Sequence, residues 1–392
     1  MKLAEIIDLD KKYYMNTFGD RQNVAFEYGK GMYLYDTDGV KYTDFFAGIA
    51  VNALGYSHPE LVERLKHQIE NLIHTSSLYY IENQALLARK IAEISCADRI
   101  FFANSGAEAN EGAIKLAKMY HYKKNSGRTE IITLKNSFHG RTLATLTATG
   151  QERFHKPFYP LHPGFSYAPL NDFEALKNLA GSKAAAVMVE LIQGEGGVIN
   201  ADEEYIKNVY DFCHKNDIVF IVDEIQTGIG RTGKMFAYEH FGIEPDIFTL
   251  AKALGGGVPI GAVCAKEKYC AFTPGDHGST FGGNQLATVA GLAVLDIIKK
   301  EKLCENAEKQ GKYFAEQLKN IKAVKEVRGK GLMIGVELEM PVKEIISKLF
   351  DKKFIVGSAG ANTLRILPPL IITKDDIDAF INALTKILNQ KG

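Results

Sequence analysis

The chain has 392 residues, of which 46% are hydrophobic, and its 47 Lys and Arg residues equal its 47 Asp and Glu residues in number. That length exceeds what one hydrophobic core usually organises, so we expect a large domain accompanied by a smaller one. Without net charge, the chain has no field that would attract nucleic acid or an anionic membrane surface.

Cysteine and histidine usage argues against disulfide and metal sites. The five cysteines include no C-x-x-C pair, which speaks against a disulfide framework and a zinc knuckle. No histidines show a ligand spacing such as H-E-x-x-H. The N-terminus lacks an uninterrupted apolar core for a signal peptide, and no apolar run approaches the roughly 18 residues of a membrane span. We therefore expect a cytoplasmic protein without a metal.

The two ends of the chain predict a smaller α+β domain. Residues 31–45 contain a turn at Asp38 and Gly39 between two alternating runs, as in an antiparallel hairpin. The C-terminal part is rich in helical patterns. Strands are expected there at 331–337 and 363–366. We expect residues 1–50 and 291–392 to form this domain together.

The middle of the chain, residues 51–290, alternates short apolar runs with amphipathic stretches, which is typical of a large α/β domain. Buried strands are expected at 100–103, 131–134, 186–189, 218–222 and 247–250. Helices are expected at 108–120 and 203–215. Strands joined by crossover helices predict a mostly parallel sheet flanked by helices.

One apolar run ends abruptly in two carboxylates, Asp223 and Glu224, followed by Ile225 and Gln226. In open α/β sheets, ligands collect outside the carboxyl ends of the strands. A buried carboxylate there would stabilise a protonated pyridine nitrogen, and protonation makes the ring of pyridoxal phosphate an electron sink. An isolated pair of acids at a strand end is equally typical of solvated residues.

The next apolar run is followed by Lys252 and by three glycines at 255–257. A lysine that loses hydration at such an edge becomes a better nucleophile toward an aldehyde, and glycines let the backbone approach a flat ring. Taken alone, Lys252 is more typical of a surface lysine whose stem packs on apolar residues. Its position one strand after Asp223 favours the nucleophile.

A turn of small residues at Gly106 and Ala107 lies between a predicted strand and the helix expected to start near Glu108. Free amides at a helix start favour an anion such as phosphate. An ordinary capped helix start uses the same residue types. Ser279 and Thr280 could add hydroxyl donors.

Three further side chains are candidates for ligand contacts. Phe138 offers a ring that could stack on a cofactor, and Arg141 offers a guanidinium that could bind a carboxylate with two hydrogen bonds. Arg365 is a second candidate of the same kind. Read singly, both arginines are more typical of surface salt bridges.

Residues 228–233 match the dinucleotide-binding pattern G-x-G-x-x-G after a strand. The first glycine lies several residues beyond the strand, and no clear crossover helix follows it. We therefore prefer a pyridoxal-phosphate site to a dinucleotide site.

Six segments together resemble the class III aminotransferases of fold type I, over nearly the whole chain. They are residues 74–84 (HTSSLYYIENQ), 102–111 (FANSGAEANE), 138–146 (FHGRTLATL), 222–233 (VDEIQTGIGRTG), 250–257 (LAKALGGG) and 275–284 (GDHGSTFGGN). The resemblance implies a fold-type I enzyme that uses pyridoxal 5′-phosphate. The family often has proline after the position of Glu190, where this chain has Leu191, and we interpret that as a local packing change.

The resemblance also implies a cofactor site shared between the subunits of a homodimer. It consists of Gly106, Ala107, Phe138, Asp223, Glu224, Ile225, Gln226 and Lys252, with Thr280 from the neighbouring subunit. Lys252 would carry the cofactor as a Schiff base, Asp223 would pair with the pyridine nitrogen, and Gln226 would contact the ring hydroxyl. Gly106 and Ala107 would bind phosphate, as would Thr280.

The substrate contacts follow from the same resemblance. Arg141 would hold the α-carboxylate of the amino donor, and Ser279 would lie beside the substrate. Arg365 would pair with Glu195 until a dicarboxylate displaces that acid, so that one site could accept two unlike substrates.

The implied reaction transfers the δ-amino group of N2-acetyl-L-ornithine to 2-oxoglutarate, forming N-acetyl-L-glutamate 5-semialdehyde and L-glutamate in arginine biosynthesis. Ornithine and 4-aminobutyrate are the nearest alternative donors, and succinylornithine and acylated lysine analogues remain open. Ornithine-specific members place a tyrosine at Ile49, so this isoleucine favours an acylated or absent amine, although it could equally be core. A glutamate-1-semialdehyde-type aminomutase and a catalytically idle cofactor-binding protein are more distant alternatives.

Overall fold

The structure is a computed structural model of the chain and describes residues 1–19 and 21–389. A seven-stranded sheet forms its centre, with strands in the order β4, β12, β11, β10, β7, β5 and β6. Only β12 runs antiparallel to its neighbours, so the prediction of a mostly parallel sheet is confirmed. The strands are β4 (Arg99–Ala103), β5 (Glu130–Leu134), β6 (Phe165–Ala168), β7 (Ala184–Val189), β10 (Val219–Asp223), β11 (Ile247–Leu250) and β12 (Gly261–Ala265).

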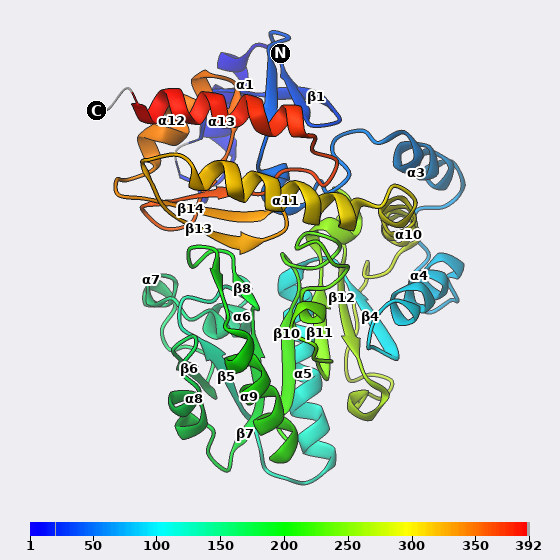
Figure 1. Cartoon of the computed structure of the whole chain (residues 1–392). Helices are drawn as coiled ribbons and strands as arrows, with labels where there is room; N and C mark the ends of the chain where they lie inside the picture. The colour runs from blue at the N-terminus through cyan, green and yellow to red at the C-terminus, as the bar shows by residue number, and fades with distance from the viewer. Residues whose placement is uncertain (20, 390–392) are drawn as a thin grey trace.

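Helices cover both faces of this sheet, because consecutive residues of its strands point to opposite sides. Val219 of β10 belongs to the same apolar cluster as the buried face of α5 (Gly106–Lys123). Phe220, the next residue, belongs instead to the cluster of α9 (Glu203–Lys215). The two helices therefore lie on opposite faces (Figure 1). Burial on both sides explains the uninterrupted apolar runs of the central strands.

Further helices complete the layers around the large sheet. They are α3 (Pro59–Asn71), α4 (Glu82–Glu93), α6 (Leu143–Ala148), α7 (Glu152–His155), α8 (Phe173–Leu179) and α10 (Gln285–Lys300). A short two-stranded ribbon, β8 (Ile192–Gln193) with β9 (Ile199–Asn200), follows β7. No helix within the described residues is long and apolar enough to cross a membrane.

The N-terminal and C-terminal segments share a second sheet, in the order β1, β2, β3 and β15. The predicted hairpin at Asp38 and Gly39 is confirmed, since β2 and β3 pair antiparallel around it. Thr43 of β3 lies opposite Phe354 of β15 in a parallel pair. The ring of Phe45 stacks on Phe380 with centroids 4.5 Å apart. The strands are β1 (Phe26–Lys30), β2 (Tyr33–Asp36), β3 (Lys41–Asp44) and β15 (Phe354–Ile355).

A third sheet of four strands, in the order β13, β14, β17 and β16, lies beside the second one above the large sheet (Figure 1). Its strands are β13 (Val324–Lys330), β14 (Met333–Leu338), β16 (Gly357–Ser358) and β17 (Thr363–Ile366). The strand expected from residue 331 begins at Met333 instead, because Gly331, with φ +55°, lies in the turn after β13. The remaining helices are α1 (Leu3–Tyr13), α2 (Ala47–Ala50), α11 (Leu303–Lys319), α12 (Lys343–Asp351) and α13 (Lys374–Asn389).

Candidate active site

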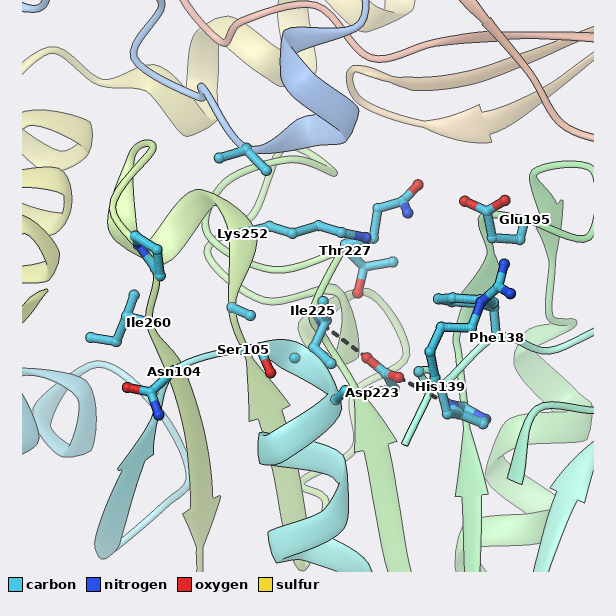
Figure 2. Close-up of a pocket in the computed structure, with 18 of the residues that line it drawn as sticks. Asn104, Ser105, Phe138, His139, Glu195, Asp223, Ile225, Thr227, Lys252 and Ile260 are labelled. Atoms are coloured by element: carbon cyan, nitrogen blue, oxygen red, sulfur yellow. Dashed lines mark hydrogen bonds and ion pairs between the residues drawn. The ribbon is translucent and has the colours of Figure 1, made fainter. Parts of the chain in front are cut away.

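A cavity of about 470 Å³ opens at the carboxyl ends of the parallel strands, where ligands of open α/β sheets bind. Its volume lies within the range usual for small-molecule sites. Most of the residues that the sequence singled out line it together, although they are far apart in the chain (Figure 2). They are Gly106, Ala107, Phe138, Arg141, Glu195, Asp223, Ile225, Gln226 and Lys252.

The carboxylate of Asp223 is buried at the end of β10 and held from three directions. Oδ2 accepts hydrogen bonds from Nδ2 of Asn110 and Nδ1 of His139, each at 2.8 Å, and Oδ1 accepts one from the amide of Ile225 at 3.0 Å. Burial works against the imidazolium form of His139, but the hydrogen bond and the charge of Asp223 outweigh it and raise the pKa of His139. The carboxylate of Asp223 thus lies among three hydrogen-bond donors at the end of β10.

Asn110 and His139 are functional side chains that our sequence reasoning missed. Asn110 lies on the buried face of α5 and bridges three segments, since its amide also donates to the carbonyl of His139 and its Oδ1 accepts from Thr249. A signal was present in the sequence, because an asparagine among the apolar residues of a helix face requires buried partners. That signal does not say which partners they are.

Lys252 lies two residues after the end of β11 and opens a short 3-10 turn, η3 (Lys252–Gly255). Its side chain extends into the cavity above Asp223 (Figure 2). Burial lowers the pKa of Lys252 to about 8, with Asp223 acting in the opposite direction and Arg365 adding to the effect. Its backbone has φ +45°, a left-handed conformation that costs energy for a non-glycine residue and clusters at functional sites. The arrangement yields an amine that is readily deprotonated near neutral pH.

The helix behind the small-residue turn begins at Gly106, two residues earlier than expected. Ser105 is the N-cap, and its hydroxyl accepts from the amide of Glu108 at 3.2 Å. The amides of Gly106 and Ala107 belong to the first turn, which has no acceptors within the helix. A side chain at Gly106 would lie 2.8 Å from Cδ1 of Ile225. Glycine at this position therefore keeps open a cradle suited to an anion.

Two candidate carboxylate-binding arginines differ in their partners. Arg141 forms no hydrogen bond or ion pair within residues 1–19 and 21–389, and its guanidinium lies over the ring of Phe154, 4.0 Å from the centroid. Arg365, on β17, donates from Nη1 to Oε1 of Glu195 at 2.5 Å, so the expected pair is present. Nε of Arg365 is buried and has no partner in the described part of the chain.

Four of the predicted residues do not line this cavity: Arg365, which reaches it through its pair with Glu195, and Glu224, Ser279 and Thr280. The side chain of Glu224 points away from it and accepts from the amide of Tyr238 at 2.9 Å, and burial raises the pKa of Glu224 to about 7. Ser279 accepts from Nδ2 of Asn104 at 3.0 Å, at the edge of a separate depression that Thr280 also lines. In a single copy of the chain, Thr280 therefore does not reach Gly106.

Ile49 lies in α2, two residues before Val51, which lines the cavity. Ala47, Gly48, Ile49 and Ala50 all have positive φ values, between +49° and +66°. A left-handed turn of this kind is costly for residues other than glycine and persists only where the surrounding structure enforces it. Ile49 itself remains 41% exposed.

Comparison with known proteins places this geometry in a family. Residues 14–388 match the family model Aminotransferase class-III. The chain is 53% identical to an acetylornithine aminotransferase of Caldanaerobacter subterraneus subsp. tengcongensis over 98% of this chain and 99% of that one. It is also 53% identical to an acetylornithine aminotransferase of Methanocaldococcus jannaschii over 98% of each chain.

Solved structures agree with the family match. The ornithine aminotransferase of Toxoplasma gondii superposes with a TM-score of 0.95 and 31% identity over 100% of this chain and 97% of that one. A second structure of that enzyme, with partial occupancy of PLP at its active site, superposes with a TM-score of 0.92 and 32% identity over 98% of this chain and 93% of that one. The acetylornithine aminotransferase of Elizabethkingia anophelis superposes with a TM-score of 0.88 and 32% identity over the whole of both chains.

Proposed function

Because this chain belongs to the class-III aminotransferases, we propose that it binds pyridoxal 5′-phosphate and moves the δ-amino group of N2-acetyl-L-ornithine to 2-oxoglutarate. The products are N-acetyl-L-glutamate 5-semialdehyde and L-glutamate. One observation carries the proposal: a buried lysine and a buried aspartate line one cavity with Arg141, which has no hydrogen bond or ion pair among the described residues, and with Glu195, which is paired with Arg365.

The residues of the cavity fit the cofactor. Asp223 suits a protonated pyridine nitrogen, and Oε1 of Gln226 is buried without a partner among the described residues, so it suits the ring hydroxyl. The open cradle at Gly106 and Ala107 suits the phosphate. When bound, pyridoxal phosphate supplies an aldehyde that takes up an amino group and a ring that withdraws electrons from the adjacent carbon.

Lys252 is the residue we propose for proton transfer. With the cofactor bound, its amine, with a pKa lowered to about 8, would bond to the aldehyde carbon and, once the amino donor has taken its place, would carry a proton from the substrate carbon to that cofactor carbon. Asn110 and His139 hold the carboxylate of Asp223 in the same cavity. We expect Phe138, which lines the cavity, to limit the movement of the ring.

The two arginines account for two unlike substrates. We assign the α-carboxylate of the donor to Arg141, which lacks a polar partner in the described chain and can bind a carboxylate with two hydrogen bonds. Arg365 stays paired with Glu195 while the donor is bound. 2-Oxoglutarate has a second carboxylate, which replaces Glu195 on Arg365. Ile49, two residues before the cavity-lining Val51, suits a donor whose α-amine is acylated or absent.

We further propose a homodimer whose subunits share their sites. Thr280 is exposed beside Phe281, which is 59% exposed, so both are available to a second copy of the chain. Leu78, 87% exposed, lines the neighbouring depression, and Tyr79, 68% exposed, adds apolar surface next to Leu78 in the chain. In the dimer, Thr280 of one subunit contacts the cofactor phosphate held by the other. Ser279 then lies beside the substrate.

We also propose the expected division, with residues 51–290 in the large cofactor-binding domain and 1–50 and 291–392 in the smaller one, except that residues 291–300, the rest of α10, stay with the large domain. The pairing of β3 with β15 supports this division. All five cysteines are free thiols, in accord with the expectation of a cytoplasmic location, which stays a prediction.

The experiment that tests the reaction monitors the absorbance of the holoenzyme without any keto acid. N-Acetylornithine, ornithine and 4-aminobutyrate are added in parallel. Rapid conversion of the cofactor by N-acetylornithine alone supports the proposal, and preference for ornithine refutes the interpretation of Ile49. Preference for 4-aminobutyrate, which has no α-amine, would refute the proposed donor instead. Turnover of glutamate 1-semialdehyde without 2-oxoglutarate would indicate the aminomutase instead. Binding without any conversion would indicate an idle cofactor-binding protein.

A further inference from the structure

Glu195, the acid paired with Arg365, stands on a glycine-rich loop, residues 194–197, that separates two hollows. On one side Glu195 lines the active-site cavity. On the other side Gly196 and Gly197 line a surface depression of about 420 Å³, whose wall includes Arg328. The loop therefore separates the active-site cavity from this surface depression.

Polar contacts hold both ends of this loop. At its start, the amide of Gly194 donates to Oε1 of Glu190 at 3.3 Å. At its end, the carbonyl of Gly197 accepts from Nε and Nη2 of Arg328 at 3.2 Å and 3.0 Å. Gly197 has φ +118°, which favours glycine. The ends are anchored, while the loop backbone between them keeps the freedom of glycine.

Arg328 connects the same loop to the strand that carries Arg365. Its Nη2 also donates to Glu337 at 2.8 Å and to the hydroxyl of Thr363 at 3.1 Å. Thr363 lies two residues before Arg365 in β17 and therefore on the same face of that strand. Arg328 is largely buried, with 14% of its side chain exposed. The guanidinium of Arg328 therefore connects the loop that carries Glu195 to the strand that carries Arg365.

We propose that Arg328 is a positioning residue for the amino acceptor: it sets the distance between Glu195 and Arg365 without touching either substrate. With Gly197 and Thr363 held by one group, Glu195 can leave Arg365 by a local rotation while Arg365 stays in place to receive the second carboxylate. This inference rests on the proposed function. It assigns Arg328 a role in the acceptor reaction and none in the donor reaction.

The test compares Arg328→Met with Arg64→Met in the holoenzyme. Arg64 is a matched control, because it also bridges two acids, Glu60 and Asp296, outside the loop network. For Arg328→Met, we expect the KM for 2-oxoglutarate to rise on the order of tenfold, the scale of one lost charge-assisted hydrogen bond. The single-turnover rate of Arg328→Met with N-acetylornithine should stay within about twofold of wild type. For Arg64→Met, both this rate and the KM for 2-oxoglutarate should stay within about twofold of wild type.

Glutarate, a dicarboxylate that cannot react, separates failure of this inference from failure of the proposed function. Calorimetry should show glutarate binding about tenfold more weakly to Arg328→Met than to wild type. This comparison stands even if N-acetylornithine proves not to be the donor. Equal glutarate affinity in the two proteins, or equal damage to the donor and acceptor reactions, would overturn the inference.

Thr363→Val provides a second variant in case Arg328→Met does not fold. It removes one acceptor of Arg328 at nearly constant side-chain volume, so we expect a rise of about threefold in the KM for 2-oxoglutarate. An unchanged KM for this folded variant, together with unchanged hydrogen exchange at the amides of 194–197, would also overturn the inference.

Discussion

Oδ2 of Asp223 and Nδ1 of His139 lie 2.8 Å apart, and both side chains are almost completely excluded from solvent. The amide of Asn110 donates to the same oxygen atom. In such a site a carboxylate keeps its charge only if its neighbours supply positive charge or hydrogen bonds. His139 and Asn110 therefore determine how well Asp223 can stabilise a protonated ring nitrogen.

Replacing His139 should weaken the electron-withdrawing power of the site. His139→Phe removes one of the hydrogen bonds to Asp223, so we expect the single-turnover rate with the donor to fall at least about tenfold. The donor KM should change little. His214→Phe is the control, since His214 pairs with Asp246 at 3.1 Å before the amino end of β11, away from Lys252. Equal losses in the two variants would contradict this role.

Capture of pyridoxal phosphate by cofactor-free protein should accelerate as pH rises to about 8, the lowered pKa of Lys252. Only the neutral amine attacks an aldehyde, so the rate should change about tenfold per pH unit below that value and level off above it. Borohydride trapping followed by mass spectrometry measures the capture. Lys252→Ala should trap nothing. A rate that is flat between about pH 6 and about pH 9 would show that the amine is not the titrating group.

Gly106→Ala should reduce cofactor affinity by about tenfold, because the added methyl group meets Ile225 at 2.8 Å and narrows the phosphate cradle. Gly181→Ala is the matched control, since its added methyl group would meet no atom within 4 Å. Fluorescence titration of the cofactor-free proteins measures the affinity. The same affinity in both variants would exclude a tight cradle at Gly106.

Glu195→Gln should release Arg365 for dicarboxylates. The variant removes the charge of the acid that lies 2.5 Å from Nη1 of Arg365, so the KM for 2-oxoglutarate should fall by about threefold or more. Conversion by N-acetylornithine should change less, because we assign its carboxylate to Arg141. Glu267→Gln, in an exposed pair with Arg99, is the control. A higher KM for 2-oxoglutarate in Glu195→Gln would mean that Glu195 helps to bind the acceptor.

Glu224 should make the protein less stable at high pH. Burial raises its pKa in the folded state to about 7, above the unfolded value of about 4.3. The folded state therefore binds more protons between these values, and its stability falls as pH rises through about 7. Denaturant unfolding at about pH 5 and about pH 8 should show a loss on the order of 2 kcal/mol. The decrease in the free energy of unfolding should be smaller in Glu224→Gln. An identical decrease in the two proteins would mean that other groups cause the pH dependence.

Local pattern was sufficient to identify much of the framework. Apolar runs such as 247–250 predicted β11 at its observed ends, because strands buried on both faces consist of uninterrupted apolar residues. The carboxyl ends of parallel strands meet at one edge, so Asp223 and Lys252 could be expected near each other before any coordinates. The family motifs added the pairing of Glu195 with Arg365, which the geometry contains.

The sequence did not predict the residues that hold these groups in place. Asn110, His139 and Arg328 act through partners that are distant in the chain, and no local pattern indicates such partners.

By itself, the sequence of this protein determined which side chains carry the chemistry and on which strand ends they stand, because those depend on local residue type and periodicity. The tertiary structure decided which of them face the cavity. Asp223 and Glu224 are adjacent and chemically alike, yet only Asp223 lines it. Successive residues of an extended chain point to opposite sides, and the packing of the helices and the second sheet alone decides which side contains the site.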